Sequence, residues 1–466
     1  MTTSILKVAH GILLRGHPET GNGLDKSALL KALGNIPSTT FRAAAEEIGA
    51  LSSEPGLRFF DASMRGRIAF GPGAGLAVGV SVGAENVRAV LVDANGWEYH
   101  HVESDALAGQ TSASPDVVLE RIKDTVAKSL EKAFTDSEPD LLVEGELPLL
   151  GWAVAWPTPI DRASKPSGNA LSHPSWRSGQ PLDQRVRIKL GIREMPTYAL
   201  SDAHAAAIAV AHRETHRPEH REWRHARLTI VLRLAGNVSG GVVILAPTRQ
   251  DQEVGEISGF VDSILLAGYD NNAGEIGHAP ICPSLVAELA DNDEAGPLTL
   301  QRCSCVSPDD EELPSHLEAY ASVLALTKRL YPELPRGEAL RRVLDDPEQD
   351  RHRRALLDVG ALVGDALLSP IAILNPAQIT LTGSLALPLV HDEIEERVGK
   401  AHKLGAQPAI TALGGTENDF IRASGAALAL IRKLVHRRLA ELLDNEKEGV
   451  SRNVRALTIR RASNPL

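Results

Sequence analysis

The fold is decided by the stretch Leu76-Ala77-Val78-Gly79-Val80-Ser81-Val82-Gly83. A run of small and apolar residues of this length, without helical periodicity, predicts a fully buried strand. A turn at 84–86 and a second apolar run at 87–93 follow it, and Asn95-Gly96 marks the next turn. We therefore predict a hairpin of buried strands at the start of a sheet.

The same plan recurs about 150 residues later, where apolar runs at 228–234 and 240–245 flank a turn at 235–239. Two strand–turn–strand units at this separation predict a duplicated α/β fold with two lobes. If the fold binds a nucleotide, its phosphates would lie between the two turns.

Further elements fill the two lobes and set the predicted domain boundaries. A helix at 115–133 and a strand at 150–156 complete the first lobe, and a helix at about 425–443 packs back on it. The second lobe receives helices at 316–331, 336–345 and 350–369. The predicted domains are a head at 1–74, a first lobe at 75–199, a second lobe at 200–424 and a polar tail at 444–466.

The head has the layout of a winged helix-turn-helix DNA-binding module. Helices are predicted at 4–15, at 26–33 after the capping residue Asp25, and at 39–50 after Ser38. Strands at 57–60 and 64–70 would form the wing. The residues expected to face DNA are Ser38, Thr39, Thr40, Arg42, Arg65 and Arg67. Any small three-helix bundle is the alternative.

Charge is distributed in keeping with a DNA-reading head. The net charge of -11 argues by itself against a nucleic-acid partner. Residues 1–70, however, carry eight Lys and Arg against six Asp and Glu, so all of the negative excess lies in the rest of the chain. A weakly basic head on an acidic body fits a DNA-reading module joined to another function.

A cytoplasmic location is expected. The first thirty residues hold no apolar segment that ends in small residues, and polar residues interrupt the most apolar long stretch, 229–246, so no membrane partner is expected. Three cysteines, two of them in Cys303-Ser304-Cys305, suit metal binding in a reducing compartment better than a disulfide framework.

Possible metal ligands and ligand-binding groups gather in one part of the chain. The stretch Ala273-Gly274-Glu275-Ile276-Gly277-His278 places a carboxylate and an imidazole three residues apart. Cys303, Cys305 and then His316-Leu317-Glu318 follow within about forty residues. Cysteine and histidine in this number are the raw material of a tetrahedral zinc site.

Over about residues 5–435 the chain resembles the ROK family of repressors, open reading frames and sugar kinases. The resemblance rests on the order and spacing of six pieces: 78–83, 201–207, 273–278, the Cys-x-Cys before 317–322, 374–384 and 423–427. It implies an actin/hexokinase-like, ribonuclease H-like duplicated fold behind the winged helix-turn-helix head.

The resemblance also implies roles for particular residues. Asp202 occupies the position of the kinases' catalytic base, which removes a proton from a sugar hydroxyl. Glu275, His278 and Glu318 match positions that hydrogen-bond sugar hydroxyls, and Asn169 is a weaker match. Without the resemblance, a helix N-cap is the alternative role for Asp202.

The residues that would handle phosphate depart from the kinase pattern. Ser81 stands where the kinases carry an aspartate, and Glu85 brings a negative charge to the first turn. In the second turn Ala235, Asn237 and Ser239 replace glycines. We therefore expect no ATP or Mg²⁺ as cofactor and no catalytic residues. Asp202 is expected to be a vestigial base that still faces the sugar, together with Glu275, His278 and Glu318.

The zinc ligands implied by the resemblance are His278, Cys303, Cys305 and His316, with His316 at a position that is usually cysteine. Cys282 competes as the fourth ligand, and a degenerate site without metal is the alternative. Arg88 and Arg233 lie near the turns. These two arginines make a phosphorylated sugar a possible ligand. The alternative is that both simply cap strand ends.

These observations predict a transcriptional regulator that binds an operator in double-stranded DNA and senses a sugar-type effector. A homodimer or homotetramer would match paired DNA half-sites. The alternatives are an active ATP-dependent sugar kinase and a non-catalytic sugar-binding protein.

Overall fold

The structure is a computed structural model of the 466-residue chain. It describes three short strands before residue 71 and, from residue 75 on, a body with gaps. The described ranges of the body are 75–83, 86–94, 96–104, 113–135, 149–166, 176, 180–192, 195–216, 226–247, 261–268, 273–290, 295–298, 316–401 and 407–447.

The first lobe is built on a five-stranded sheet with the order β6-β5-β4-β7-β8. Its strands are β4 (Leu76–Val82), β5 (Val87–Asp93), β6 (Glu98–Glu103), β7 (Leu149–Trp156) and β8 (Thr197–Ser201). Every residue of β4 is buried, as its uninterrupted apolar run predicts. β4 pairs antiparallel with β5 and parallel with β7, so the predicted hairpin is confirmed.

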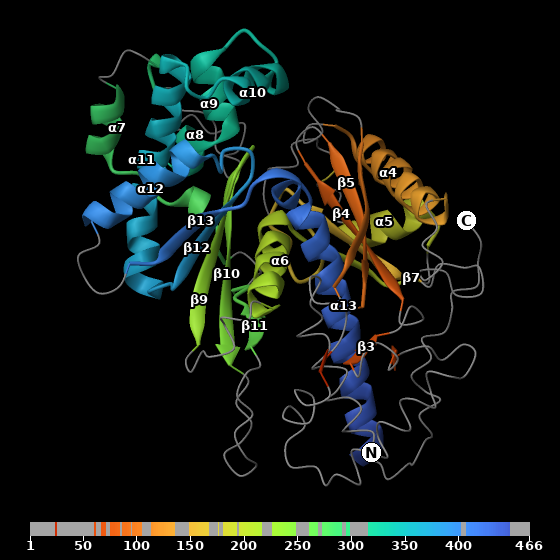
Figure 1. Cartoon of the computed structure of the whole chain (residues 1–466). Helices are drawn as coiled ribbons and strands as arrows, with labels where there is room; N and C mark the ends of the chain where they lie inside the picture. Colours follow the sequence, from red (N-terminus) through yellow and green to blue (C-terminus); the bar gives the residue numbers. More distant parts are fainter. Residues whose placement is uncertain are drawn as a thin grey trace.

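The second lobe repeats this plan with the sheet order β11-β10-β9-β12-β13. Its strands are β9 (Arg227–Leu234), β10 (Val238–Pro247), β11 (Val261–Leu265), β12 (Gln378–Thr382) and β13 (Ala409–Ala412). β9 and β10 form the second predicted hairpin, with a turn at 235–237. Both lobes therefore show mixed α/β architecture, as predicted (Figure 1).

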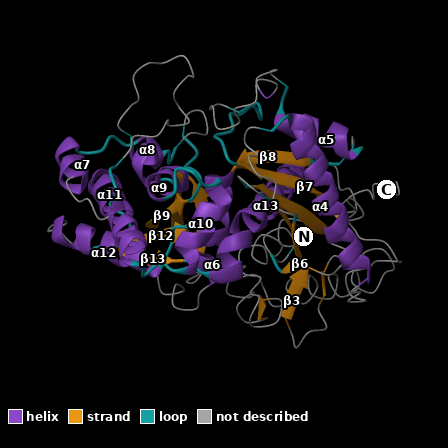
Figure 2. Cartoon of the chain, turned by 90° about the horizontal axis from the view of Figure 1, so that it is seen from above, coloured by secondary structure: helices purple, strands orange, loops and turns teal. Residues whose placement is uncertain are grey.

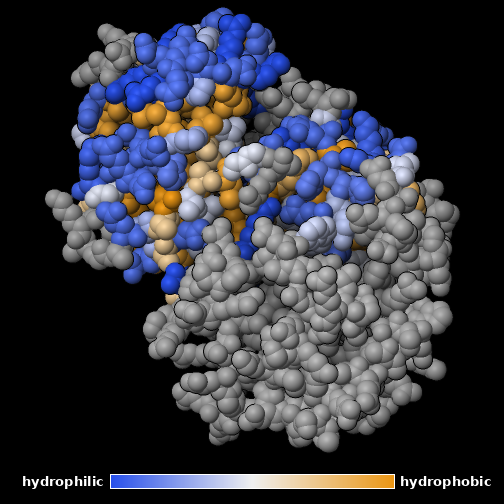
Figure 3. Space-filling view, in the orientation of Figure 1, coloured by the Kyte–Doolittle hydropathy of each residue, from blue (hydrophilic) through white to orange (hydrophobic). Residues whose placement is uncertain are grey.

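Helices cover the two sheets. In the first lobe these are α4 (Pro115–Thr135) and α5 (Leu182–Leu190). In the second lobe they are η5 (Ile276–His278), α7 (Pro283–Ala290), α8 (Leu317–Ala321), α9 (Val323–Leu330), α10 (Arg336–Asp345), α11 (Asp350–Leu374) and α12 (Pro388–Ala401). In Figure 3 hydrophilic residues dominate the outer surface of this lobe, and apolar residues show between its helices.

Two helices cross between the lobes and determine where the site lies. α6 (Asp202–His216) follows the first sheet but packs on β9, β10 and β11 of the second. α13 (Gly415–Lys447) follows the second sheet but packs on β4, β5 and β7 of the first. The two helices also pack on each other, so the layers run sheet, α13, α6, sheet (Figure 2).

Glycines make this close crossing possible. A Cβ atom at Gly79 of β4 would collide with the carbonyl oxygen of Ala423, and one at Gly425 of α13 with that of Ala205. α13 therefore lies against backbone on both sides, which leaves it little freedom to shift sideways.

Among the described helices, one is long and apolar enough to cross a membrane, namely α11. Of its most apolar 18-residue window, 61% is buried inside the protein, as in the core helix of a globular domain. α11 ends at Asn375, whose φ of 45° gives the left-handed C-cap that asparagine tolerates.

The head is described only by β1 (Leu24–Asp25), β2 (Phe60–Asp61) and β3 (Arg67–Phe70), which form a small antiparallel sheet in the order β1-β3-β2. The pairing of Phe60 with Phe70 agrees with the hairpin predicted for the wing. The predicted helices of the head and residues Ser38, Thr39, Thr40, Arg42 and Arg65 lie outside the described residues, as does the side chain of Arg67.

Several predicted helix bounds were wrong. The helix predicted at 316–331 is broken at Ser322, whose hydroxyl accepts the amide of Ala325 while the Val323 amide donates to Ala235 in the second turn. The helix predicted to end before Pro370 continues through it to Leu374. α13 begins at Gly415, ten residues earlier than predicted, and runs to Lys447 into the predicted tail.

Candidate functional site

Asp202 is the first residue of α6 and lies where the two lobes meet. The alternative role of N-cap belongs to its neighbour, since the Ser201 hydroxyl accepts the amide of His204 at 3.2 Å. The Asp202 side chain is 4% exposed and is therefore available for other buried partners.

Two arginines are those partners. Arg233 of β9 places its Nη1 atom 2.9 Å from Asp202 Oδ2, and Arg422 of α13 places its Nη1 atom 3.6 Å from the same oxygen. The side chains of Arg233 and Arg422 are 9% and 8% exposed. The cluster of Asp202, Arg233 and Arg422 (hereafter the Asp202 cluster) joins the second sheet to the helix that packs on the first.

The Asp202 cluster holds more positive than negative charge. Burial, and then the neighbouring charge of Arg233, lower the pKa of Arg422 to about 9, although Asp202 acts in the opposite direction. Arg422 still carries its proton at neutral pH. Because Arg88 has its own partners, Glu103 at 3.2 Å and Asp419 at 3.3 Å, two buried cations share the carboxylate of Asp202.

Glu275, His278 and Glu318 form the other half of the site. The Nδ1 atom of His278 lies 4.0 Å from Glu275 Oε2, and Glu318 is buried at the start of α8. Burial raises the pKa of Glu275 to about 7, and the negative charges of Asp202 and Glu318 add to this effect. Asp202 and three residues predicted to face the sugar are thus brought together.

The glycines of the motif 273–278 allow its backbone to lie against the start of β10. Gly274 has a φ of 95°, which favours glycine, and Cβ atoms at Gly274 and Gly277 would collide with the carbonyl oxygens of Gly240 and Val238. The segment 274–277 is therefore seated directly on the start of β10. This contact places Glu275 and His278 beside the second turn.

His204 is a positioning residue that the sequence did not single out. Its Nε2 atom lies 3.1 Å from the Ala273 carbonyl oxygen, and burial lowers its pKa. A neutral imidazole that donates from Nε2 ties the motif at 273–278 to the first turn of α6. The sequence feature that could have identified His204 is its position two residues after Asp202 in the motif 201–207.

Two of the predicted zinc ligands lie together. The rings of His278 and His316 are 5.6 Å apart between centroids. The Nε2 atom of His278 is shielded from solvent and has no hydrogen-bond partner among the residues that the structure describes, which suits a metal ligand. Burial, together with the charge of His278, lowers the pKa of His316, and only a neutral imidazole binds a metal.

The cysteines do not settle the zinc set. Cys303 and Cys305 lie outside the described residues, as do Asn169 and Glu85. Cys282 is exposed, and a contact of 3.0 Å with the Ser284 hydroxyl, followed by backbone amides, lowers its pKa. The predicted competition between Cys282 and His316 therefore stays open.

The turns that would hold a nucleotide's phosphates are used for other contacts. The Asn237 amide donates across the lobes to the Pro157 carbonyl oxygen at 3.3 Å. Ser81, in the position of the kinases' aspartate, is 1% exposed, and its hydroxyl has no hydrogen-bond partner. Arg88 and Arg233 do not cap strand ends, because both side chains form ion pairs between elements.

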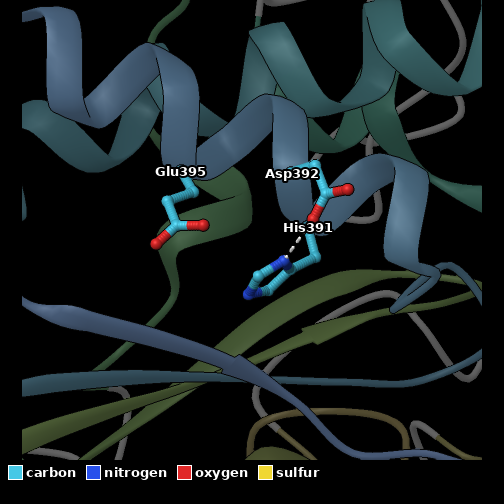
Figure 4. Close-up of side chains that lie close together, drawn as sticks. All are labelled: His391, Asp392 and Glu395. Carbon is cyan, nitrogen blue, oxygen red and sulfur yellow. Dashed lines mark hydrogen bonds and ion pairs between the residues drawn. The ribbon is translucent and has the colours of Figure 1, made fainter.

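A second group with metal-ligand spacing lies outside this site. His391, Asp392 and Glu395 project from α12 (Figure 4). His391 already contacts the Asp392 carboxylate through Nδ1 at 2.9 Å and the Ile410 carbonyl through Nε2 at 3.0 Å. The group is therefore engaged as a surface link between α12 and β13, and it has no part in the predicted site.

Comparisons with known proteins identify the fold. No family model and no curated protein matches the chain. A solved ROK family transcriptional regulator, a homologue of the MLC protein of E. coli, matches at a TM-score of 0.55 and 14% identity, covering 94% of this chain and 100% of that one. A ROK family glucokinase from Streptomyces griseus, solved with glucose and AMPPNP, matches at a TM-score of 0.50 and 19% identity, covering 76% of this chain and 98% of the glucokinase. The chain therefore has the hexokinase-like α/β fold of ROK proteins.

Proposed function

We propose that the chain is a DNA-binding transcriptional regulator whose kinase-like body senses a sugar or sugar derivative without phosphorylating it. The observation that carries the proposal is the ion pairing of Asp202 with Arg233 and Arg422. A catalytic base must approach a substrate hydroxyl, whereas this carboxylate is already ion-paired with two buried guanidinium groups.

The extent of the structural matches supports the regulator over the kinase. The match to the ROK regulator extends over 94% of this chain, and that to the glucokinase over 76%. The chain thus has room for a head in addition to a kinase-sized body. A head with the predicted winged helix-turn-helix would read an operator, and a homodimer or homotetramer would present paired heads to two half-sites.

Sugar sensing rests on the half of the site formed by Glu275, His278 and Glu318. Carboxylates accept hydrogen bonds from vicinal hydroxyls, and an imidazole can donate or accept. In this proposal the effector binds between the lobes and shifts the population between two arrangements of the heads. Zinc, held by His278, Cys303, Cys305 and His316, would fix the tautomer of His278 when bound.

DNA binding is tested first. Full-length protein is expected to shift a sequence-selected duplex at moderate salt, and Arg42→Ala is expected to weaken that binding by about 1–3 kcal/mol if Arg42 reads a base edge. Arg342→Ala, on the exposed surface of α10 in the second lobe, is the matched control and should bind normally. The proposal fails if no sequence-selective shift occurs, with or without sugars.

Effector sensing is tested on the same duplex. A sugar that binds should change the affinity for DNA, and Glu318→Gln should abolish that change while DNA binding itself persists. If DNA binding is intact but indifferent to every sugar, an operator-binding protein without a sugar effector replaces the proposal. If sugar binds but no duplex does, the chain is a non-catalytic sugar-binding protein.

A further inference from the structure

Hydroxyl groups on the strands beside the Asp202 cluster have no hydrogen-bond partner among the described residues. Ser239 on β10 and Thr382 on β12 stand directly opposite Arg233 on the two neighbouring strands, so the three side chains rise from one face of the sheet. Both hydroxyls are buried, with residue exposures of 8% and 1%, and neither has a partner. A buried hydroxyl without a partner is costly unless a ligand or water satisfies it.

The first lobe contributes a similar group from the opposite side. The buried, unpartnered hydroxyl of Ser81 lies in β4, two residues before Gly83. Arg422 reaches the same turn, because a Cβ atom on Gly83 would lie 3.7 Å from its Nη2 atom. Arg422 thus directs one nitrogen toward Asp202 and the other toward the first turn.

The charges of this region do not balance. Arg233 and Arg422 share one carboxylate, that of Asp202, whereas Arg88 is matched by Glu103 and Asp419. Within the described part of the chain, two buried guanidinium groups thus share a single carboxylate.

We propose that Arg233 and Arg422, with the hydroxyls of Ser81, Ser239 and Thr382, bind an oxyanion carried by the effector. Guanidinium and hydroxyl donors are the groups that recognise phosphate and carboxylate oxygens. Asp202 lies between this half and the half containing Glu275 and Glu318. The effector is therefore a carbohydrate that bears a phosphate or a carboxylate, and this inference rests on the proposed sensing function.

The region between the lobes would thus hold the oxyanion of an effector and not the phosphates of a nucleotide, as it does in a kinase. A nucleotide's phosphates would need the second turn, which here bears Ala235 and Asn237 in place of glycine. The oxyanion is instead bound deeper, beside Asp202. Because its donors come from β9, β10 and β12 on one side and from β4 and α13 on the other, a bound oxyanion would hold the two lobes together.

The test is calorimetric titration of full-length protein with glucose, N-acetylglucosamine, the 6-phosphates of both, glucuronate and inorganic phosphate. At least one charged sugar is expected to bind more than about tenfold more tightly than its neutral parent, a difference of about 1.4 kcal/mol. The phosphates and glucuronate distinguish the two sources of the oxyanion. Equal affinity for the charged and neutral forms, or no binding by any of these probes, overturns the inference.

Variants locate the oxyanion. Arg422→Met should reduce the affinity for the charged sugar to that for its neutral parent and leave the neutral sugar unaffected. Ser239→Ala keeps every charge of the site, so it serves as a second variant in case Arg422→Met fails to fold. It should lower the affinity for the charged sugar by about threefold, the value of one hydrogen bond. Arg354→Met, whose guanidinium pairs with Asp358 away from the site, is the matched control. Retention of the preference in both Arg422→Met and Ser239→Ala overturns the assignment.

The failures of the two proposals can be told apart. A preference for charged sugars that depends on Arg422, in a protein that binds no duplex, supports the oxyanion site and refutes the regulator. A neutral sugar that changes DNA binding, without any preference for charged sugars, supports the regulator and refutes the oxyanion site.

Discussion

Asp202 balances two buried cations, so its removal and the removal of one of its partners should differ greatly in their effect on stability. Without the carboxylate, Arg233 and Arg422 face each other unpaired. Without Arg422, a simple pair of Asp202 and Arg233 remains. The two substitutions therefore test whether the cluster carries a surplus of positive charge.

We expect Asp202→Ala to lower the free energy of unfolding by about 3–5 kcal/mol, the usual cost of an uncompensated buried charge. Arg422→Met should change it by less than about 1 kcal/mol in either direction, since methionine fills similar volume without charge. Urea titration of full-length protein, followed by fluorescence, measures both. Equal losses for the two variants would show that no charge surplus exists.

Glu275 should make stability depend on pH. Its folded-state pKa of about 7 is above the ordinary value of 4.5, so the folded state favours the protonated carboxyl. This contribution is present in full below about pH 4.5 and is lost as pH rises to about 7, because the ionised form is then buried beside Asp202 and Glu318.

Glu275→Gln removes that dependence. Relative to wild type, the variant should gain about 1–3 kcal/mol between pH 5 and pH 8, and the gain should level off above pH 8. Thermal unfolding at several pH values gives the comparison. Parallel pH profiles for the two proteins would contradict the raised pKa.

At the scale of the elements, sequence patterns located the two hairpins and β7, but neither the other strands of the two sheets nor the contacts between distant segments. The two hairpins, β7 and α4 follow from apolar runs and local turns, and they were predicted within a few residues. The break at Ser322 was missed because it depends on a hydrogen bond to Ala235, far away in the sequence. Helical periodicity does not report such long-range contacts.

Only part of the site could be predicted, because contacts between distant segments leave no local pattern in the sequence. Glu275 and His278 are neighbours in one motif, and the resemblance brought Asp202 and Glu318 to them. Arg422 lies 220 residues after Asp202 and reaches it only because α6 and α13 cross. A sign of its importance was present in the sequence, since Arg422 is the single charge in the otherwise small and apolar stretch 420–431.

The segment 274–277 offers a prediction at this scale. Gly277→Ala places a methyl group against the Val238 carbonyl oxygen, so the segment must move away from β10. We expect a loss of about 1–3 kcal/mol in unfolding free energy, typical of overpacking, together with weaker sugar binding. Gly414→Ala is the control, because no atom lies within 4 Å of the added methyl. Equal behaviour of the two variants would contradict the described contact.

For the whole molecule, the expected result is catalytic silence. ATP consumption in the presence of glucose, N-acetylglucosamine, mannose or xylose should not exceed that of Asp202→Asn, a control that retains the shape of the side chain. The reason is that Asp202 is already ion-paired with Arg233, and the Asn237 amide donates across the lobes where phosphates would lie. A turnover of roughly 1–1000 per second would establish a sugar kinase instead.

The long helix α13 has a mechanical consequence. Its 33 residues, at about 1.5 Å of rise each, make a rod of about 50 Å that begins between the lobes and extends well beyond the sheets (Figure 1). Gly79 and Gly425 fix it near one end, close to Arg422. From Arg422 to Lys447 the rod measures about 38 Å, so a tilt of about 5° at the fixed end moves the free end by about 3 Å. Any small tilt of α13 about Gly425 would therefore be a much larger displacement at Lys447 than at Arg422.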